Sequence, residues 1–368
     1  MSDAPITLFL CGDVMTGRGI DQVLEHSCPP NLYEAAVSSA LDYVALAEDV
    51  NGPIPREVNP EYTWGDALAL LEARRPDLRI INLETSITTS EDAEAKGINY
   101  RMHPGNVAVL RAARIDCAVL ANNHVLDWGE RGLLETREVL ASAAILAPGA
   151  GRNLAEARAP AALTVGGGGR VLVFSLGATD SGIPRDWAAE AGRAGVALLP
   201  DFSERTIEDI AGGVRAARRT GDLIVASIHW GDNWGYEIPQ EHRRFAHALI
   251  ERAGIDVVHG HSSHHPKAIE VHRGRPIFYG CGDFLNDYEG IGGYEAFRSD
   301  LVLMYLPTLQ ASTGELLRLE MVPLKIRNFR LSVPSPAERL WLCERMAREC
   351  ARFGHQVVMR GEALELVP

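Results

Sequence analysis

The chain has 368 residues, of which 46% are hydrophobic and 23% charged, and this composition excludes bulk disorder, collagen-like repeats and low-complexity sequence. Asp and Glu number 49 against 36 Lys and Arg, and the net charge of −13 argues against nucleic acid as a partner. No apolar run reaches the roughly 18 residues that a membrane span needs. The N-terminus also lacks the pattern of a signal peptide, so we expect a cytoplasmic protein without an integral membrane segment.

Strands and helices are predicted to alternate along the chain. The apolar run from Ile6 to Cys11 predicts a buried strand that ends at Gly12 and Asp13. The same patterns predict strands at 79–83, 117–121, 223–228 and 256–258, helices at 64–75, 107–114, 132–144, 207–219, 241–253 and 337–353, and strand pairs at 161–165/170–176, 268–271/276–279 and 301–306/316–322. Repeated strand–helix units indicate an α/β layered fold, and the hairpins indicate mixed sheets.

The domain organisation is predicted to be a single domain over residues 1–368, because no internal repeat and no long biased linker divides the chain. Residues 28–59 are rich in proline and aromatic residues and are predicted to form a lid or insertion. Residues 325–368 are predicted to form a helical and strand extension. The glycines at 166–169 precede a strand and not a helix, which indicates a hairpin turn and not a phosphate loop.

Polar residues follow one predicted strand after another. In an α/β sheet, the groups beyond the carboxyl ends of the strands converge on one crevice. Eight of the 12 histidines also fall between His229 and His272, and neutral imidazole is the commonest metal-binding side chain. The clusters are Asp13, Asn82 with Glu84, Asn122–Asn123–His124 with Asp127, His229, and His259 to His265. Carboxylate, amide and imidazole ligands together suit Mn, Fe, Zn or Mg, so the order predicts a site for divalent ions.

Each of these residues has a plain structural interpretation when it is taken alone. Asp13 could cap a helix that begins near Gly17, and Glu84 could cap or pair on the surface. A single histidine such as His229 is more often a satisfied core residue than a ligand. His259, His265 and His272 are interpreted as wall or surface groups. The prediction of a metal site therefore rests on the ordered series of polar clusters and not on any single residue.

The ordered motifs resemble the CapA family, which is named for poly-γ-glutamate capsule synthesis and belongs with the calcineurin-like metallophosphoesterases. The matching stretches are LFLCGDVMTGR at 8–18, IINLETSIT at 80–88, VLANNHVLDWGERGLLET at 119–136, VASIHWGDNWGYEIP at 225–239 and VVHGHSSHHPKAIEVHRGRPIFYGCGDFLND at 257–287. The resemblance implies two packed mixed sheets with helices outside, a four-layer αββα sandwich.

The resemblance also implies a role for each motif residue and one or two divalent transition ions, with Mn, Fe or Zn expected. Asp13 and His264 would bind a first metal, and Glu84 would bridge the two metals. Asn123, His229 and His261 would complete the second metal. His124 would protonate the leaving group with Asp127 orienting it, and Arg18 and Arg101 would contact an anionic small-molecule or polymer substrate.

Two positions depart from the family pattern. The superfamily's first motif usually reads Asp-x-His, whereas here Met15 follows Asp13 and Val14, so the first metal loses an expected ligand. Asp283 stands where relatives often have Asn, and the sequence gives it no role.

Three functions remain open from the sequence. A metal-dependent phosphoesterase is the main expectation, because two metals and an acid suffice for phosphoryl transfer. The first alternative is hydrolysis or processing of a γ-glutamyl amide. The second alternative is a capsule-synthesis component that binds metal and polymer without hydrolase activity. The sequence does not specify the oligomeric state.

Overall fold

Two large mixed β-sheets form the centre of the computed structural model, which describes residues 4–367. The first sheet has the order β19-β20-β17-β16-β1-β2-β5, with β15 beside β1 and β18 beside β17. Its strands are β1 (Ile6–Val14), β2 (Leu78–Leu83), β5 (Cys117–Val119), β15 (Asp283–Leu285), β16 (Leu301–Leu309), β17 (Leu316–Arg327), β18 (Arg330–Ser332), β19 (Gln356–Arg360) and β20 (Ala363–Val367).

The second sheet has the order β10-β8-β11-β12-β14-β13, with β7 beside β8. Its strands are β7 (Ala161–Thr164), β8 (Arg170–Ala178), β10 (Leu198–Leu199), β11 (Asp222–His229), β12 (Val257–His261), β13 (Ile269–His272) and β14 (Arg275–Phe278). Two small pairs complete the strands, β3 (Ser86–Ile87) with β4 (Arg101–Met102) and β6 (Ala150–Gly151) with β9 (Gly195–Val196).

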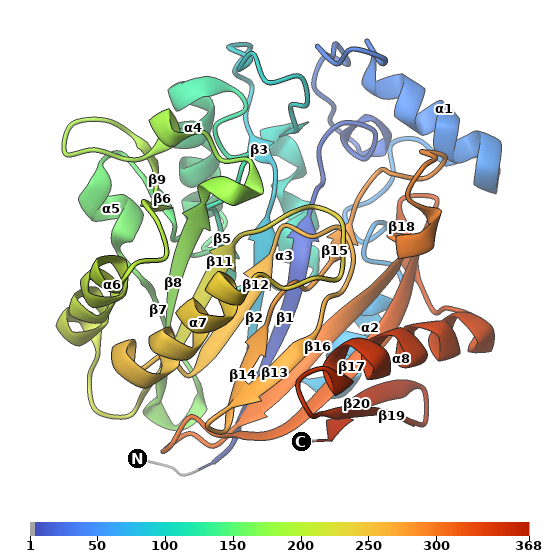
Figure 1. The fold of residues 1–368 in the computed structure, drawn as a ribbon. Coiled ribbons are helices and arrows are strands. Elements are labelled where there is room, and N and C mark those ends of the chain that lie inside the picture. The colour runs from blue at the N-terminus through green and yellow to red at the C-terminus, as the bar shows by residue number, and fades with distance from the viewer. Residues whose placement is uncertain (1–3, 368) are drawn as a thin grey trace.

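The helices lie mainly on the outer faces of the two sheets (Figure 1). The α-helices are α1 (Ala40–Asn51), α2 (Ala67–Arg74), α3 (Ala108–Ala112), α4 (Gly129–Ser142), α5 (Leu154–Arg158), α6 (Glu204–Ala217), α7 (Gln240–Ala248) and α8 (Pro336–Ala351). The short 3₁₀-helices are η1 (Asp21–Val23), η2 (Pro104–Val107), η3 (Gly166–Gly168), η4 (Thr179–Ser181), η5 (Arg185–Trp187) and η7 (Glu295–Phe297). The element η6 (Leu249–Ala253) is a short π-helix.

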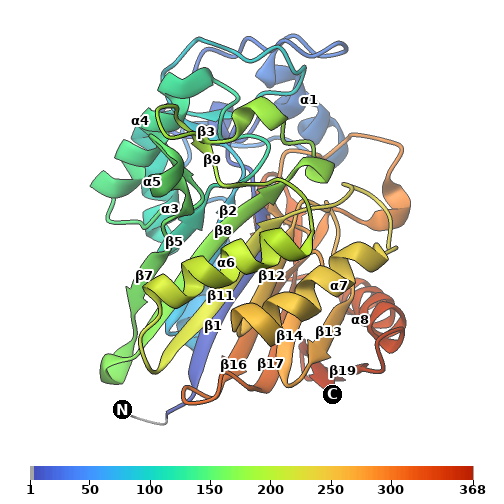
Figure 2. The same ribbon diagram turned by 60° about the vertical axis from the view of Figure 1, so that its left-hand side comes forward.

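Strand β1 shows how the layers pack. Successive side chains of a strand point to opposite faces of the sheet. Leu8 and Leu10 enter a core shared with Val173, Val225 and Val257 of the second sheet, so the two sheets pack face to face. Phe9 and Cys11 point the other way, into a core shared with residues of α2, α3 and α4. A third core lies under α6 and α7, which cross the outer face of the second sheet in Figure 2.

The mixed α/β fold predicted from the sequence is confirmed. The three predicted antiparallel strand pairs form as β7–β8, β13–β14 and β16–β17. The predicted helix over 241–253 is confirmed as α7 continued by the π-helix η6, whereas no helix begins at Gly17, where only the short 3₁₀-helix η1 follows. Helix α1 was not predicted, because its surroundings were interpreted as a lid.

The polar strand ends meet because the strands that carry them run in the same direction within each sheet. β1 pairs parallel with β2, and β2 with β5. β11 likewise pairs parallel with β8 and β12. The carboxyl ends of these strands lie at the upper end of the molecule in Figure 1, where α1 and its flanking loops also lie. The C-terminal segment completes the first sheet, since β20 pairs with β17.

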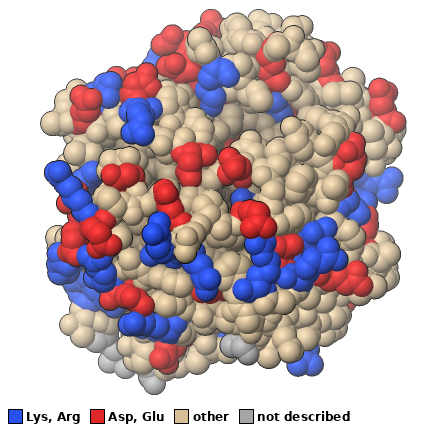
Figure 3. All heavy atoms as spheres, in the orientation of Figure 1, with Lys and Arg blue, Asp and Glu red and all other residues tan. Residues whose placement is uncertain are grey.

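Acidic and basic side chains are interspersed on the face shown in Figure 3, and neither sign covers it continuously. This distribution differs from the basic stripe of a nucleic-acid-binding face. Within residues 4–367, no helix combines the length and apolar character needed to cross a membrane.

Candidate metal centre

Asp13 is placed by a close approach of β1 to the segment before β15. A Cβ atom at Gly12 would lie 1.7 Å from the carbonyl oxygen of Gly282, so only glycine allows this approach. The Asp13 amide donates to the same carbonyl oxygen at 3.0 Å. The register sets Asp13 directly opposite Asp283, so two carboxylates from distant parts of the sequence share one end of the sheet.

Two groups of potential metal ligands meet at Asp13. The first group is Asp13, His229 and His261, and the second is Asp13, His264 and Asp283. In each group the candidate ligand atoms all lie within 4.8 Å of one another, and every residue is buried. The carboxylate of Asp13 therefore belongs to both groups, which is the arrangement that two neighbouring ions with a common ligand require.

Hydrogen bonds hold the ligands of the first group in place. His229 Nδ1 and His261 Nδ1 are 2.9 Å apart, and His229 Nε2 lies 3.0 Å from Asn123 Oδ1. The hydroxyl of Ser227 lies 2.9 Å from His261 Nε2, which leaves Nδ1 facing the centre. Groups that fix the second nitrogen of a histidine also fix its ring orientation for a metal. Burial lowers the pKa of His229 and of His261 well below the usual value, so both rings are neutral and can offer a lone pair.

The turn that carries His264 has an unusual backbone. Ser262 has a φ of 102°, a conformation that L-residues rarely adopt. This turn directs the Ser262 amide toward Asp13 Oδ2 at 3.2 Å and brings His264 Nδ1 to 2.9 Å from Asp283 Oδ1. Although burial alone would lower the pKa of His264, Asp283 raises it above the usual value.

Glu84 lies between the ligand groups and the cavity. Its Oε1 is 3.8 Å from His229 Nε2 and 3.7 Å from His124 Nε2, and its buried Oε2 has no hydrogen-bond partner. Burial raises the pKa of Glu84 well above its usual value, and Asp13 adds to this effect. Burial and the neighbouring Asp283 likewise raise the pKa of Asp13 to about 7. Burial and mutual repulsion therefore disfavour the charged forms of Asp13 and Glu84.

His124 belongs to a chain of three polar side chains. Asp127 Oδ2 is 2.6 Å from His124 Nδ1, and Asp127 Oδ1 accepts from Lys96 Nζ at 2.7 Å. The amide of Tyr100 donates to Asp127 Oδ2 at 2.6 Å, and Lys96 also donates to the backbone carbonyl of Asn123. Burial lowers the pKa of His124 to about 4, with Lys96 adding to the effect and Asp127 opposing it. Lys96 was not predicted, since it lies in a loop without a motif.

A cavity of about 410 Å³ opens onto these residues. Among its lining residues are Arg18, Tyr43, Glu84, Lys96, Tyr100, Asn123, His124, Trp234, His264 and Tyr288. The volume falls within the range of roughly 300–1,000 Å³ that is usual for small-molecule sites. Arg18 was predicted to contact substrate and does line this cavity. Arg101 does not: its guanidinium lies over the ring of Trp128 at 3.8 Å and donates to the carbonyl oxygens of Ser90 and Pro29.

The eight residues predicted as metal ligands or catalytic groups lie close together at the strand ends, and Asp283 lies among them. The eight are Asp13, Glu84, Asn123, His124, Asp127, His229, His261 and His264. Met15 is fully buried, and its sulfur accepts a hydrogen bond from the hydroxyl of Tyr288 at 3.7 Å. Asp283 instead supplies a third group beside Asp13 and His264. The motif around Gly282 was visible in the sequence, but its pairing with β1 was not. His259 and His265, which were interpreted as wall or surface groups, are buried and bonded to the backbone: His259 Nε2 is 2.8 Å from the carbonyl oxygen of Cys11, and His265 Nε2 accepts from the Gly235 amide.

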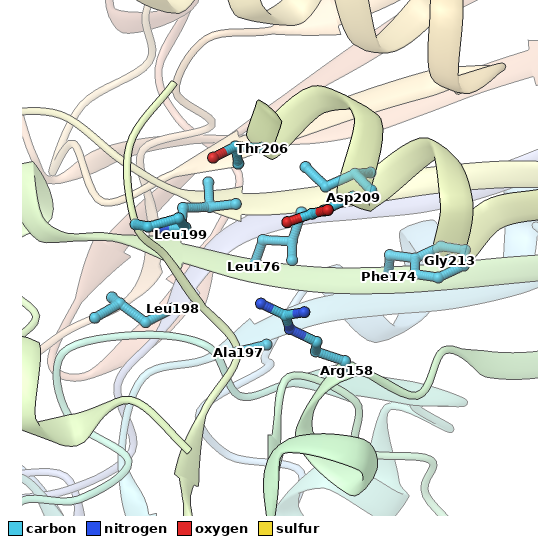
Figure 4. A pocket seen from close by; sticks show the side chains of 11 residues that line it. Arg158, Phe174, Leu176, Ala197, Leu198, Leu199, Thr206, Asp209 and Gly213 are labelled. Carbon is cyan, nitrogen blue, oxygen red and sulfur yellow. The ribbon is translucent and has the colours of Figure 1, made fainter. Parts of the chain in front are cut away.

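A second cavity, of about 70 Å³, lies between α6 and strands β8 and β10 (Figure 4). Its walls are largely aliphatic, with Leu176, Leu198 and Leu199 among them. Arg158 and Asp209 lie on opposite sides of this cavity in Figure 4. Its lining contains neither histidine nor a pair of carboxylates, whereas histidines line the cavity at the strand ends.

Comparison with known proteins identifies the family of the chain. Residues 7–288 match the family described as bacterial capsule synthesis protein PGA_cap, and the chain belongs to this family, as the CapA resemblance predicted. The chain is 49% identical over 366 residues to a "Probable polyglutamine synthesis accessory protein" of Mycobacterium tuberculosis, covering 99% of this chain and 96% of the relative. It is 26% identical to the "PGA biosynthesis protein CapA" of Bacillus subtilis, covering 92% and 75%.

Proposed function

We propose that the chain is a metal-dependent hydrolase of the calcineurin-like metallophosphoesterase type, with a phosphoester as the substrate bond, and that it acts in poly-glutamate synthesis. The observation that carries this proposal is the position of His124. Its Nε2 atom faces Glu84 at 3.7 Å on the wall of the cavity, while its Nδ1 atom is held by Asp127. A protein that only binds metal has no need for an oriented histidine beside the ligands.

The residues at the strand ends fit divalent ions. Asp13, Glu84 and Asp283 are buried close together, Glu84 Oε2 has no partner, and the neighbouring imidazoles of His229 and His261 are neutral. One ion would be held by Asp13, His264 and Asp283, and the other by Asp13, His229, His261 and Asn123, with Glu84 beside both. Mixed carboxylate, amide and imidazole ligands suit Mn, Fe or Zn. Such ions supply positive charge that polarises the group under attack and makes water a better nucleophile.

His124 is proposed to donate a proton from Nε2 to the oxygen of the leaving group. Asp127 fixes the ring through Nδ1 and stabilises the imidazolium. Lys96 holds the other oxygen of Asp127 and thereby fixes the carboxylate. Burial and Lys96 disfavour the imidazolium, and an anionic phosphoryl group in the cavity would favour it again.

Two further functions remain as alternatives. The same residues could act on a γ-glutamyl amide, because a metal-activated water attacks carbonyl groups as well. The chain could also be a component of poly-glutamate capsule synthesis without hydrolase activity. The relatives are named as a polyglutamine synthesis accessory protein and a PGA biosynthesis protein, which favours a role in polymer synthesis, but these names specify no reaction.

The test is to remove bound metal from the full chain and restore it with Mn, Fe or Zn in turn. Each form is then assayed on a panel of phosphomonoesters, phosphodiesters and γ-glutamyl amides. Metal-restored hydrolysis of a phosphoester, abolished in Glu84→Gln, is the expected result. Turnover of amides alone would favour the first alternative, and tight metal binding without turnover of any compound would favour the second.

A further inference from the structure

The loop over residues 31–39 carries one acidic side chain, Glu34, and this side chain is buried. Residues 31–39 form a small loop closed at its base, where the Leu32 amide donates to the Ser38 carbonyl at 2.9 Å and the Ala40 amide to the Pro30 carbonyl at 2.7 Å. Tyr33 in this loop is 59% exposed. The side chain of Glu34, by contrast, is only 9% exposed, because it reaches inward to Arg18.

The contacts of Glu34 are those of a bound carboxylate. Arg18 Nη1 donates to Glu34 Oε1 at 3.0 Å, and the hydroxyl of Tyr43 donates to Oε2. Arg18 is held from its other side by Asp287, which accepts from Nε at 3.1 Å and from Nη2 at 2.5 Å. The guanidinium also lies 3.9 Å from the ring centre of Tyr43 and 4.4 Å from that of Tyr100. Asp287 and the two rings therefore preorganise Arg18, and Glu34 uses the one remaining edge.

This anion site adjoins the candidate metal centre. Arg18 and Tyr43 line the same cavity as Glu84 and His124. Tyr100 lies between the two ends, since its ring packs against Arg18 and also lies edge-on to His124 with 4.5 Å between ring centres. A molecule with a reacting group at His124 and a carboxylate at Arg18 would therefore span the cavity.

We propose that Arg18 and Tyr43 form a subsite for a carboxylate of the substrate, which Glu34 occupies when no substrate is bound. The proposal rests on the proposed function for the reacting end of the substrate, but the subsite itself is defined by binding. Arg18 is already shared by two carboxylates, so the Glu34 contact can be exchanged for an equivalent one without leaving a buried charge unpaired. A substrate carboxylate would thus release the loop over residues 31–39.

The test is the affinity for γ-glutamyl-glutamate, measured by titration calorimetry on the full metal-loaded chain. The measurement uses the His124→Asn background, in which any turnover is slowed. Glu34→Ala removes the internal competitor, which is tethered at an effective concentration in the millimolar range, and should tighten binding at least about tenfold. The matched control is Glu48→Ala, because Glu48 pairs with Arg56 at 2.9 Å in the same segment and does not line the cavity. The second ligand is the amide of the dipeptide, in which neutral carboxamides replace the carboxylates.

The subsite is supported if γ-glutamyl-glutamate binds more tightly to Glu34→Ala than to the parent, while Glu48→Ala shows no gain in affinity and the dipeptide amide gains nothing from Glu34→Ala. Equal affinity in Glu34→Ala and the parent, or an equal gain for the neutral amide, would overturn it. Backbone amide hydrogen exchange gives a second readout. It is measured on the chain with native Glu34, so it does not depend on whether a Glu34 variant folds. Exchange over residues 31–39 should rise when the dipeptide binds, and unchanged or slower exchange would contradict the proposal. Both readouts measure binding and neither measures catalysis. A failure of the carboxylate subsite can therefore be distinguished from a failure of the proposed hydrolase function.

Discussion

Asp13 and Asp283 lie opposite each other in the pairing of β1 with β15, and His264 Nδ1 is 2.9 Å from Asp283 Oδ1. Met15 stands where the superfamily motif usually has histidine, and it is buried with its sulfur accepting from the Tyr288 hydroxyl. The two carboxylates and His264 form one of the two ligand groups that contain Asp13.

Asp283→Asn is expected to weaken one metal site and to leave the other nearly unchanged. An amide keeps the shape of the side chain but removes the charge that Asp283 contributes. Metal titration followed by elemental analysis should show one ion lost at limiting metal. Met15→His is the complementary change and should tighten the same site. Loss of both ions together in Asp283→Asn would contradict the separate roles of the two ligand groups.

His261→Ala is expected to lower affinity for the other ion by at least an order of magnitude, because His261 belongs to the ligand group with Asp13 and His229. His265→Ala is the matched control from the same segment, since His265 Nε2 accepts from the Gly235 amide on the wall. Equilibrium dialysis with Zn or Mn measures both variants. Equal retention of metal in the two variants would remove His261 from the ligand set.

Lys96→Met is expected to lower kcat while leaving metal content and KM nearly unchanged. The substitution removes the cation that holds Asp127 Oδ1 at 2.7 Å, and His124 then loses part of its orientation. The loss should be a fraction of the ~10²–10⁴-fold that a general acid contributes. Lys96→Arg should recover part of the rate, because it restores a donor to Asp127. A rise in KM without a change in kcat would instead assign Lys96 to substrate binding.

Glu338 provides a pH-dependent contribution to stability that is independent of the site. Although partial burial acts to raise the pKa of Glu338, Lys325 and the Ser335 amide lower it to about 2, against 4.5 ordinarily. A carboxyl group with a lowered pKa stabilises the fold above pH 4.5, and this stabilisation is lost as the pH falls toward 2. Glu338→Gln should therefore lower stability by about 1–2 kcal/mol at pH 7 and by much less near pH 2.

Thermal unfolding at the two pH values measures this difference. Glu344→Gln is the matched control on the same helix, because Glu344 lies on the exposed face of α8. It should change the melting temperature little at either pH. A Glu338→Gln effect of the same size at pH 7 and near pH 2 would show that the lost carboxylate charge is not its cause.

The sequence predicted the parts of the centre that follow from local pattern. Asp13, Glu84, His229 and His261 each come at or just after a buried strand, and parallel pairing brings such positions to one end of a sheet. Asp127 was predictable as the partner of His124 because it follows three residues later in the same motif.

The remaining features depend on contacts between segments that are distant in sequence. Asp283 meets Asp13 only because Gly12 lets the two backbones approach, and Lys96 reaches Asp127 from an irregular loop. Arg101 was expected at the substrate, but its side chain stacks on Trp128 instead. Helix α1 carries apolar residues on its exposed side as well, such as Leu41 and Val50, so the sequence pattern does not mark a single buried face.

The dependence of rate on the leaving group tests most directly whether the centre is hydrolytic with His124 as its acid. The measurement compares kcat/KM for phosphoesters of decreasing leaving-group acidity, in the metal-loaded parent chain and in His124→Asn. His124→Asn should keep its metal, lose ~10²–10⁴-fold on poor leaving groups, and lose much less on activated aryl esters, which need little protonation. A uniform loss on all esters together with metal depletion would contradict this role and would make His124 a ligand instead.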